Sequence, residues 1–386
     1  AKLYFMLIVH FLNVNKLFMN IKNIFWCKSC LNMSTRPRIE IDKDGNCNAC
    51  NWVDEKKTLD WSKREQELKK IIKDTKSSST YDCIVPVSGG KDGTFVTHQL
   101  KKIYNLKPLC ITVKPAMELE IGKKNLENFI KEDIDHIHIS PSLKAMSVLD
   151  TIGFLDYGQG YYGWMTAVHS AIVRIASNLN INLIVYGEDG EVEYGGTTKY
   201  KYEPCYGIEH MKRVFLNNTY EDVIKKSNLN DNEKYWFSFP EDYSKDIKIT
   251  HYSYFENWNP YQNYMLAKEK YGLEDLMASN TGTFTNFAHN DQALSALHYY
   301  LMYIKFGFGR ATQDAGIEIR RGAMTRDQAI NLVSLYDGVF PEEHVDKYLK
   351  YFGISESKFF ENIDKWANKE LFEKKNSGWK PKYKIT

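Results

Sequence analysis

The residues with the clearest chemical potential in this sequence follow a short apolar run and are Ser88, Gly89, Gly90, Lys91 and Asp92. An apolar run that ends in a glycine turn before a helix is typical of a buried parallel strand. Adjacent glycines permit positive φ and let the backbone approach a ligand closely. The first amides of the next helix lack intrahelical partners and bind anions. The stretch therefore predicts a phosphate site, with Lys91 as a cation and Asp92 as a magnesium ligand.

The glycine spacing separates this site from two commoner phosphate sites. A Walker P-loop requires Gly, four residues and Gly-Lys-Ser/Thr, and a dinucleotide site requires G-x-G-x-x-G. Residues 88–94 read Ser-Gly-Gly-Lys-Asp-Gly-Thr and fit neither pattern. Thr94 offers a further hydroxyl at the start of the helix. The alternative interpretation is an ordinary strand–turn–helix corner without a ligand.

Two C-x-x-C pairs near the start of the chain predict a metal site. Cys27 and Cys30 form the first pair, and Cys47 and Cys50 form the second. This spacing is typical of a four-cysteine zinc ribbon, which we expect over 25–60. Four thiolates leave no open coordination position, so the zinc would be structural. Disulfides are an alternative, which fits a cytosolic chain less well. A redox role is another, but neither C-x-x-C pair opens a helix of a thioredoxin-like βαβ unit.

The amino-acid composition is typical of a globular protein and limits the kinds of partner that the chain could bind. Of 386 residues, 43% are hydrophobic and 26% are charged, and the net charge is +2. This balance gives no indication of nucleic acid as a partner. The apolar run in the first 24 residues is too short to span a membrane, so we interpret 1–24 as a leader or non-native extension of a cytoplasmic, non-membrane protein.

Alternating strand and helix patterns predict an α/β fold with a doubly wound parallel sheet from Tyr81 onward. A helix at 62–73, opened by a Ser62 capping box, and a serine-rich linker complete residues 61–80 before it. We expect strands at 83–87, 109–113, 136–139 and 182–186, and helices at 93–104, 119–132 and 165–179. In such sheets the ligand lies beyond the carboxyl ends of the strands.

Residues at those carboxyl ends complete the predicted site. Val113 and Lys114 follow the second strand, and Gly187 and Glu188 follow the last. Glu188 could hold magnesium together with Asp92, although a solvated acidic turn is the alternative. Gly195 begins another turn that could border the substrate. His169, alone on its helix, is more typical of a packed residue.

The second half of the chain gives weaker signals. An aromatic-rich stretch at about 198–285 indicates an insert over the site, within a catalytic domain of 81–340. Helices are expected at 288–305 and, after a capping box at Thr325, through 335. The residues 341–386 read as a helical tail with a frayed end. A compact arginine group could bind a phosphate or carboxylate, with a solvated loop as the alternative: Arg310, Arg320 and Arg321.

With both motifs placed, the chain resembles the N-acetyl sugar amidotransferase family of PP-loop ATP pyrophosphatases, which act in surface-polysaccharide and nonulosonic-acid biosynthesis. The resemblance rests on the two cysteine pairs, the stretch 35–42, the turn at 87–92 and Gly187-Glu188. One departure is Gly93, where many PP-loops continue directly with Ser or Thr. The resemblance implies a PP-loop fold with Ser88, Gly89 and Gly90 at the phosphates, Lys91 and Asp92 in catalysis, and Glu188 with Asp92 on Mg²⁺.

The reaction that the resemblance implies converts an acetamido group of an N-acetylated sugar into an acetamidino group. ATP would activate the amide oxygen as an adenylate, and ammonia would then displace AMP. The chain shows no glutaminase segment, so a separate glutaminase subunit is expected to supply the ammonia. ATP, Mg²⁺ and Zn²⁺ are the implied cofactors.

Two other functions stay open from the sequence. A tRNA-thiolating enzyme would need a reactive thiol, and the spare cysteines are Cys83, Cys110 and Cys205. The first two fall in expected core strands, which leaves Cys205. A non-catalytic zinc-ribbon adaptor is the third interpretation, and the complete motif at 88–92 argues against it.

Overall fold

A computed structural model describes residues 24–243, 246–376 and 378–386 of the chain. The predicted leader at 1–24, apart from Ile24, lies outside the described residues. No helix in the described ranges combines the length and apolar character needed to cross a bilayer.

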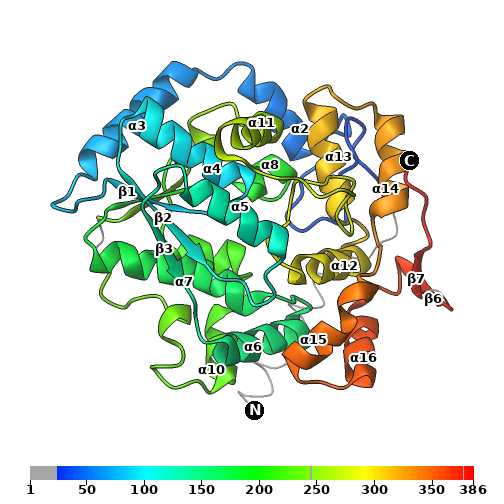
Figure 1. Cartoon of the computed structure of the whole chain (residues 1–386). Helices are drawn as coiled ribbons and strands as arrows, with labels where there is room; N and C mark the ends of the chain where they lie inside the picture. The colour runs from blue at the N-terminus through cyan, green and yellow to red at the C-terminus, as the bar shows by residue number, and fades with distance from the viewer. Residues whose placement is uncertain (1–23, 244–245, 377) are drawn as a thin grey trace, which may run out of the picture.

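The centre of the fold is a five-stranded parallel sheet (Figure 1). Its spatial order is β3-β2-β1-β4-β5, and neighbouring strands pair in parallel register. The strands are β1 Cys83–Pro86, β2 Pro108–Val113, β3 His136–Ile139, β4 Leu183–Tyr186 and β5 Lys248–His251. The chain builds outward from β1 in one direction and then in the other, so the topological switch point lies between β1 and β4. The predicted doubly wound α/β fold is confirmed.

Strand β5 is not among the predicted strands, and it corrects the interpretation of 198–285 as an insert alone. This stretch supplies the edge strand of the sheet, which pairs with β4 from Leu183↔Lys248 to Tyr186↔His251. The sequence Lys-Ile-Thr-His has a single aliphatic residue, so it lacks the apolar run by which strands are recognised. Thr250 and His251 are nevertheless buried, and the Thr250 hydroxyl donates to the carbonyl of Pro204.

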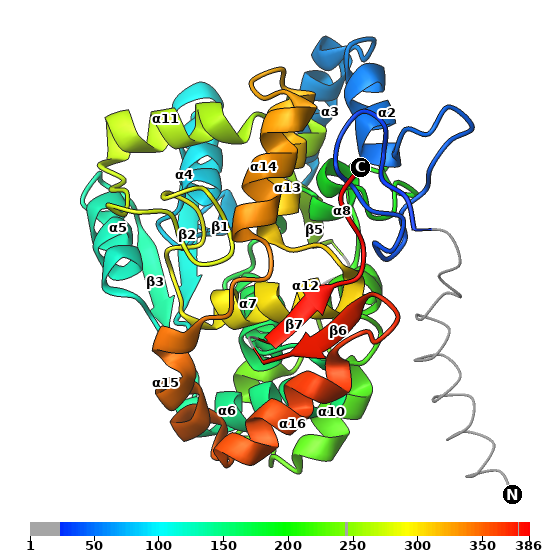
Figure 2. The same ribbon diagram turned by 90° about the vertical axis from the view of Figure 1, so that its right-hand side faces the viewer.

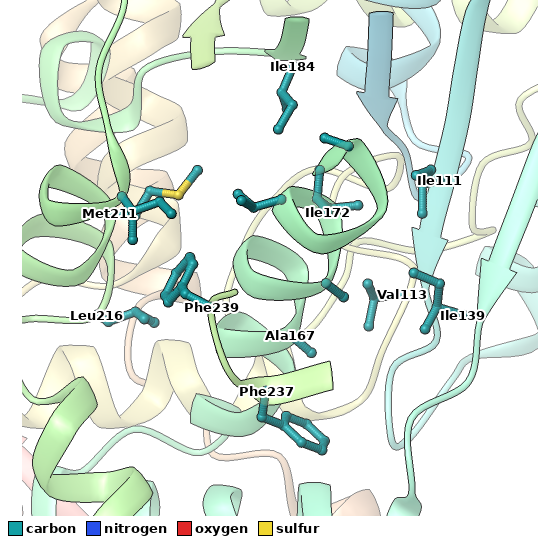
Figure 3. Close-up of a cluster of buried hydrophobic side chains, with 14 of the residues drawn as sticks. Ile111, Val113, Ile139, Ala167, Ile172, Ile184, Met211, Leu216, Phe237 and Phe239 are labelled. Carbon is teal, nitrogen blue, oxygen red and sulfur yellow. The ribbon is translucent and has the colours of Figure 1, made fainter. Parts of the chain in front are cut away.

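Helices cover both faces of the sheet and form two cores. On one face, α7 (Tyr162–Asn178) packs on the strands through Ala167 and Ile172, against Ile111 and Ile184 (Figure 3). On the other face, α4 (Lys91–His98), α5 (Glu120–Ile130) and α11 (Pro260–Tyr271) surround the second core. Burial on both faces explains the continuous apolar pattern of β1, β2 and β4.

Cys83 and Cys110 belong to the second core, as expected of inert packing residues. Burial raises the pKa of the Cys110 thiol to about 12 and the pKa of Cys83 well above its usual value.

Helix ends follow their capping residues. The N-cap of α3 (Trp61–Asp74) is Asp60, which accepts from the amide of Lys63, so the predicted Ser62 capping box is wrong. The capping box of Thr325 and Gln328 opens α14 (Arg326–Tyr336) as predicted. The predicted helix at 288–305 begins later, as α12 Leu294–Phe306, because His289 adopts a positive φ. The remaining helices before the C-terminal region are α6 Leu143–Ile152, α8 Gly190–Tyr194, α9 Ile208–His210, α10 Tyr220–Ser227 and α13 Arg310–Arg320.

The four cysteines lie in a small module at 24–56 that packs beside α8 and α13 (Figure 2). Antiparallel bridges join Trp26 to Met33 and Ile41 to Cys47, so the expected ribbon strands are reduced to single bridges. The second cysteine pair leads into α2 (Asn48–Lys56).

The C-terminal region packs on the rest of the chain, which corrects the expected frayed tail. Helices α15 (Val345–Phe352) and α16 (Glu356–Trp366) pack on α12 in a third core, and β6 (Phe372–Lys375) pairs with β7 (Gly378–Pro381). Trp379 donates to Asp364, and the Tyr383 hydroxyl donates to the carbonyl of Gly307. Trp379 and Tyr383 therefore hold the C-terminal segment on the rest of the chain, although the lysine-rich composition of this segment predicts exposure.

Candidate active site

The turn between β1 and α4 has the backbone geometry of a phosphate loop. Gly89 has a φ of +78°, and a Cβ there would lie 2.4 Å from the amide nitrogen of Leu126. Only glycine fits this position. Gly90 is the N-cap of α4 and has no capping side chain, so the first amides of the helix stay available to an anion.

Two carboxylates, one at the start of α4 and one in the loop after β4, lie beside this turn. Asp92, in the first turn of α4, forms an ion pair with Lys91 and accepts from Nδ2 of Asn263 at 3.0 Å. Glu188, two residues after β4, accepts from the hydroxyl of Tyr194 at 3.1 Å. The backbone at Gly187 approaches Asp92 closely, and a Cβ added at Gly187 would lie 3.2 Å from Cβ of Asp92. This approach requires a small residue at position 187.

These carboxylates open onto a cavity of about 320 Å³ at the carboxyl ends of β1, β2 and β4. Among the predicted site residues, its wall includes Ser88, Asp92, Val113, Gly187 and Glu188. The rest of the wall is mostly apolar, and Trp164 fixes one side by donating its indole N–H to the carbonyl of Val113 at 3.0 Å. An apolar wall with polar groups at one end suits a nucleotide.

Burial raises two carboxyl pKa values in this wall. The pKa of Glu188 rises to about 7, first because of burial and then because of the neighbouring Asp92 charge. The pKa of Asp291, which precedes α12, rises to about 6 through burial. Carboxylates that repel each other in a partly desolvated site are the usual environment of a divalent cation.

The other predicted site residues lie outside the cavity wall: Gly89, Gly90, Lys91, Thr94 and Lys114. Gly89 and Gly90 contribute through the loop backbone behind Ser88. Lys91 is buried against Asp92, and Thr94 is buried within α4, where its hydroxyl has no hydrogen-bond partner. The side chain of Lys114 is 48% exposed and reaches Glu118 at 3.9 Å.

Sequence reasoning missed four residues of the site: Trp164, Tyr194, Asn263 and Asp291. Each comes from an element far from residue 88 in the chain and belongs to no recognisable motif. The one available signal was aromatic density around 160 and 194, which is common in buried segments.

The predicted arginine cluster is wrong, because α13 separates its members. Arg310 at the start of the helix is buried, pairs with Asp314 at 2.7 Å and lies over the ring of Tyr194. Arg320 at the other end donates to the carbonyl of Glu193 at 3.1 Å, and Arg321 pairs with Glu318. Ten residues of helix span about 15 Å, so the three cannot bind one anion.

Gly195 and Gly196 contact the cysteine module, and neither lines the cavity at Glu188. Asn48 donates to the carbonyl of Gly196, and Asn32 donates to the carbonyl of Tyr194. Asp189, next to Glu188 in the chain, faces a separate cavity of about 30 Å³ that Trp52, Arg64 and other residues line. The two neighbouring acids therefore serve different sites.

His169 is a packing residue, as expected. It stacks on Phe215 with ring centroids 5.2 Å apart, and burial lowers its pKa to about 4. Burial raises the pKa of the Cys205 thiol to about 11, so this cysteine has no thiolate character at neutral pH.

The four cysteines of the module converge on one point. Their Sγ atoms all lie within 4.8 Å of one another, and the four residues are buried. The Sγ atoms of Cys27 and Cys50 are 3.7 Å apart, and those of Cys30 and Cys47 are 3.6 Å apart. N–H groups point at the sulfurs, including the amide of Cys47 at 3.2 Å from Sγ of Cys27. The cluster could hold a metal ion.

Residues 281–385 match the family described as LPS biosynthesis protein WbpG-like, C-terminal domain. This part of the chain resembles the WbpG-like proteins. The match supports the resemblance drawn from the sequence and crosses the domain boundary predicted at residue 340. The WbpG-like region contributes to the site, because Asp291 lies in the cavity wall and Arg310 lies over Tyr194.

Comparisons with whole proteins add less. No curated protein matches the chain significantly. Among solved structures, the U34-tRNA thiolase NcsA from Methanococcus maripaludis with its [4Fe-4S] cluster is similar at 15% identity and a TM-score of 0.30. The similarity covers 78% of this chain and 86% of the thiolase. At these values it carries no argument about function.

Proposed function

We propose that the protein is an ATP-dependent amidotransferase that converts the acetamido group of an N-acetyl sugar into an acetamidino group, with release of AMP and pyrophosphate. The observation that carries the proposal is that Ser88 of the phosphate turn, Asp92 and Glu188 line one cavity. The WbpG-like match at 281–385 supports a substrate from surface-polysaccharide biosynthesis.

The residues of the cavity suit activation of an amide oxygen. The backbone at Ser88, Gly89 and Gly90 would bind phosphate oxygens, and Lys91 would balance charge on the departing pyrophosphate. Asp92 and Glu188 would hold Mg²⁺, which when bound neutralises the phosphate oxygens of ATP. The proposed reaction does not require a metal-bound hydroxide as nucleophile.

The atoms balance in two steps. The acetamido oxygen attacks the α-phosphorus of ATP, and the bond between the α-phosphorus and its bridging oxygen to the β-phosphate breaks, so pyrophosphate leaves. Ammonia then adds to the activated carbon, loses protons, and the C–O bond to AMP breaks. The partly buried wall at Trp164 and Tyr186 would limit water as a competing nucleophile.

We further propose that a partner glutaminase supplies the ammonia in the cytoplasm. Outside the four-cysteine cluster, the thiols in the described part of the chain have raised pKa values, so none is activated for glutamine hydrolysis. The same observation disfavours a sulfur-transfer reaction, which also needs a thiolate.

Zinc is our proposal for the metal of the cysteine cluster. A tetrahedral ion with Zn–S bonds of about 2.3 Å places the sulfurs about 3.8 Å apart, close to the observed pairs. A [4Fe–4S] cluster binds each thiolate to a different iron, which separates the sulfurs further. Elemental analysis should find about one zinc per chain, and its absence from reduced protein would contradict the assignment.

The test of the reaction uses the purified chain with ATP, ammonium chloride and a panel of N-acetylated sugars. We expect AMP and pyrophosphate, and a sugar product lighter by the difference between O and NH. The rate should increase with pH, because more ammonium is then deprotonated. Glutamine should give no product without a second protein. Formation of ADP and orthophosphate would overturn the mechanism, and copurifying tRNA with thiolated product would favour sulfur transfer.

A further inference from the structure

A short helix, α8, packs beside α2 of the four-cysteine module (Figure 2), and the residue two positions before it, Glu188, lies in the wall of the cavity. Glu188 directly precedes its N-cap residue, Asp189, and Tyr194 is its last residue. The Tyr194 hydroxyl reaches back and donates to Oε1 of Glu188 at 3.1 Å. The orientation of Glu188 therefore depends on the position of α8.

One side chain of the cysteine module joins a metal-ligand sulfur to the end of this helix. Nδ2 of Asn32 lies 3.3 Å from Sγ of Cys47 and 3.0 Å from the carbonyl oxygen of Tyr194. Asn32 is 2% exposed. Gly195 leaves the room for it, because a Cβ at Gly195 would lie 2.6 Å from Nδ2 of Asn32.

Charged contacts from the same module hold the outer side of α8. Trp52 and Lys56 both donate to the carboxylate of Glu193, at 3.0 and 2.8 Å. Arg38 donates two hydrogen bonds to Glu191, at 2.7 and 2.6 Å. The module thus contacts α8 at Glu191, Glu193 and Tyr194. The cavity of about 320 Å³ lies at the other end of the segment, beside Glu188.

We propose that Asn32 and Tyr194 are positioning residues through which the four-cysteine module orients Glu188 for magnesium. This inference rests on the proposed function, in which Glu188 is a ligand of the ATP-bound magnesium. A free glutamate side chain samples many rotamers, and a ligand that is held by a hydrogen bond loses less entropy on binding a cation. The module is then a part of the active site's support and not only a folding unit.

The decisive variant is Tyr194→Phe, which removes one hydroxyl and keeps the ring over which Arg310 lies. We expect the Mg²⁺ concentration for half-maximal ATP binding, measured by calorimetry, to increase about tenfold, as for a lost hydrogen bond to a charged group. Metal content per chain and ATP binding without Mg²⁺ should not change. Asn32→Leu should act in the same direction.

Tyr351→Phe is a matched control. Its hydroxyl also donates to a buried carboxylate, Asp150, at 2.7 Å, but on the side of α6 away from the cysteine module. This variant should lose thermal stability without any change in the Mg²⁺ requirement. A similar change in both variants would mean that Tyr194 acts through general stability, which would overturn the inference.

Hydrogen exchange of the wild-type protein tests the inference without a measurement of turnover. It also does not require that the Asn32→Leu variant folds. Amides of 189–196 should exchange faster in wild-type protein after chelation of the module's metal, with protection of β1 and β2 retained. Unchanged exchange in α8, or an unchanged Mg²⁺ requirement in Tyr194→Phe, would refute the inference. Absence of Mg²⁺-dependent ATP binding, or of pyrophosphate release, in wild-type protein would instead refute the proposed function.

Discussion

At the scale of single residues, the site depends on two carboxylates with different surroundings. Asp92 is held by a cation, Lys91, and by the amide of Asn263. Glu188 is held by a tyrosine hydroxyl and has a pKa raised to about 7 by burial and by Asp92. A divalent cation between them would favour the charged form of both, so cation binding and carboxylate ionisation should be coupled.

Asp92→Asn should reduce the rate of pyrophosphate release by a factor of about 100 or more, with a smaller effect on ATP binding. The amide is nearly isosteric, but it removes one negative ligand of the cation. Asp189→Asn is the matched control, because that side chain faces the second cavity and its Oδ1 can still accept from the amide of Glu191. Equal losses in both variants would argue against Asp92 as the metal ligand.

At the scale of elements, close approaches between helices and loops determine where the site residues lie. The junction of α8 with the cysteine module is one such approach, and it requires glycine at 195, where φ is +94°. The junction of α6, α7 and α15 is another. There Asp150 is fully buried and accepts from the amide of Gly163 and from the hydroxyl of Tyr351.

Gly195→Ala should lower the free energy of unfolding by about 1–3 kcal/mol, because it combines a left-handed backbone with a collision at Asn32. Gly207→Ala is the control, since Gly207 has an extended φ of −115° and a Cβ added there would meet no atom within 4 Å. Chemical denaturation measures both. Equal stability of the two variants would show that α8 moves away from Asn32 at little cost.

Asp150→Asn should remove a pH dependence of stability. Burial raises the Asp150 pKa to about 7 in the folded chain, above the unfolded value. Its contribution to stability is therefore complete below about pH 4 and is lost as pH increases through 7, with a slope of at most about 1.4 kcal/mol per pH unit. As pH increases through this range, wild type should therefore lose free energy of unfolding relative to the Asp150→Asn variant. A constant difference from about pH 4 to 8 would contradict the assignment.

At the scale of the whole molecule, the C-terminal region belongs to the folding unit of the sheet. Phe154, just after α6, stacks on Phe352 and Phe359 with centroids 4.8 and 5.2 Å away. The hydroxyl of Tyr348 donates to the carbonyl of Ala293, next to the loop that carries Asp291. The C-terminal helices thus support one wall of the candidate site, in which Asp291 lies.

Deletion of 341–386 should therefore abolish folding and not merely remove a tail. The deletion removes several fully buried side chains, and each contributes about 1.5–3 kcal/mol, against a total stability of about 5–15 kcal/mol. The buried side chains are Tyr348, Phe359, Leu371 and Phe372. Soluble yield and thermal unfolding are the measurements. A soluble fragment with a cooperative transition would show that 341–386 is a dispensable tail, as the sequence pattern indicates.

The sequence alone determined the features that depend on local chemistry. The apolar run at 83–87, the two glycines and Lys91-Asp92 define a strand, a turn and a helix start within about ten residues, and each depends on its own side chains and backbone. The two cysteine pairs likewise predict their cluster through spacing. Strands β1, β2 and β4 are predictable because parallel strands that are buried on both faces are apolar throughout, and the edge strand β3 shows instead an alternating His-Ile pattern.

Only the tertiary structure decided what depends on distant segments. Arg310 lies at the opposite end of a rigid helix from Arg320 and Arg321 although the three are near in sequence. Asn263 and Tyr194 instead bond to Asp92 and Glu188 from two other helices, and Asp291 lies in the same cavity wall. Edge strand β5 pairs through its backbone, which carries no side-chain signature. The contact of Asn32 with Tyr194 spans 162 residues. Such contacts follow from the packing of whole elements, and no local pattern encodes them.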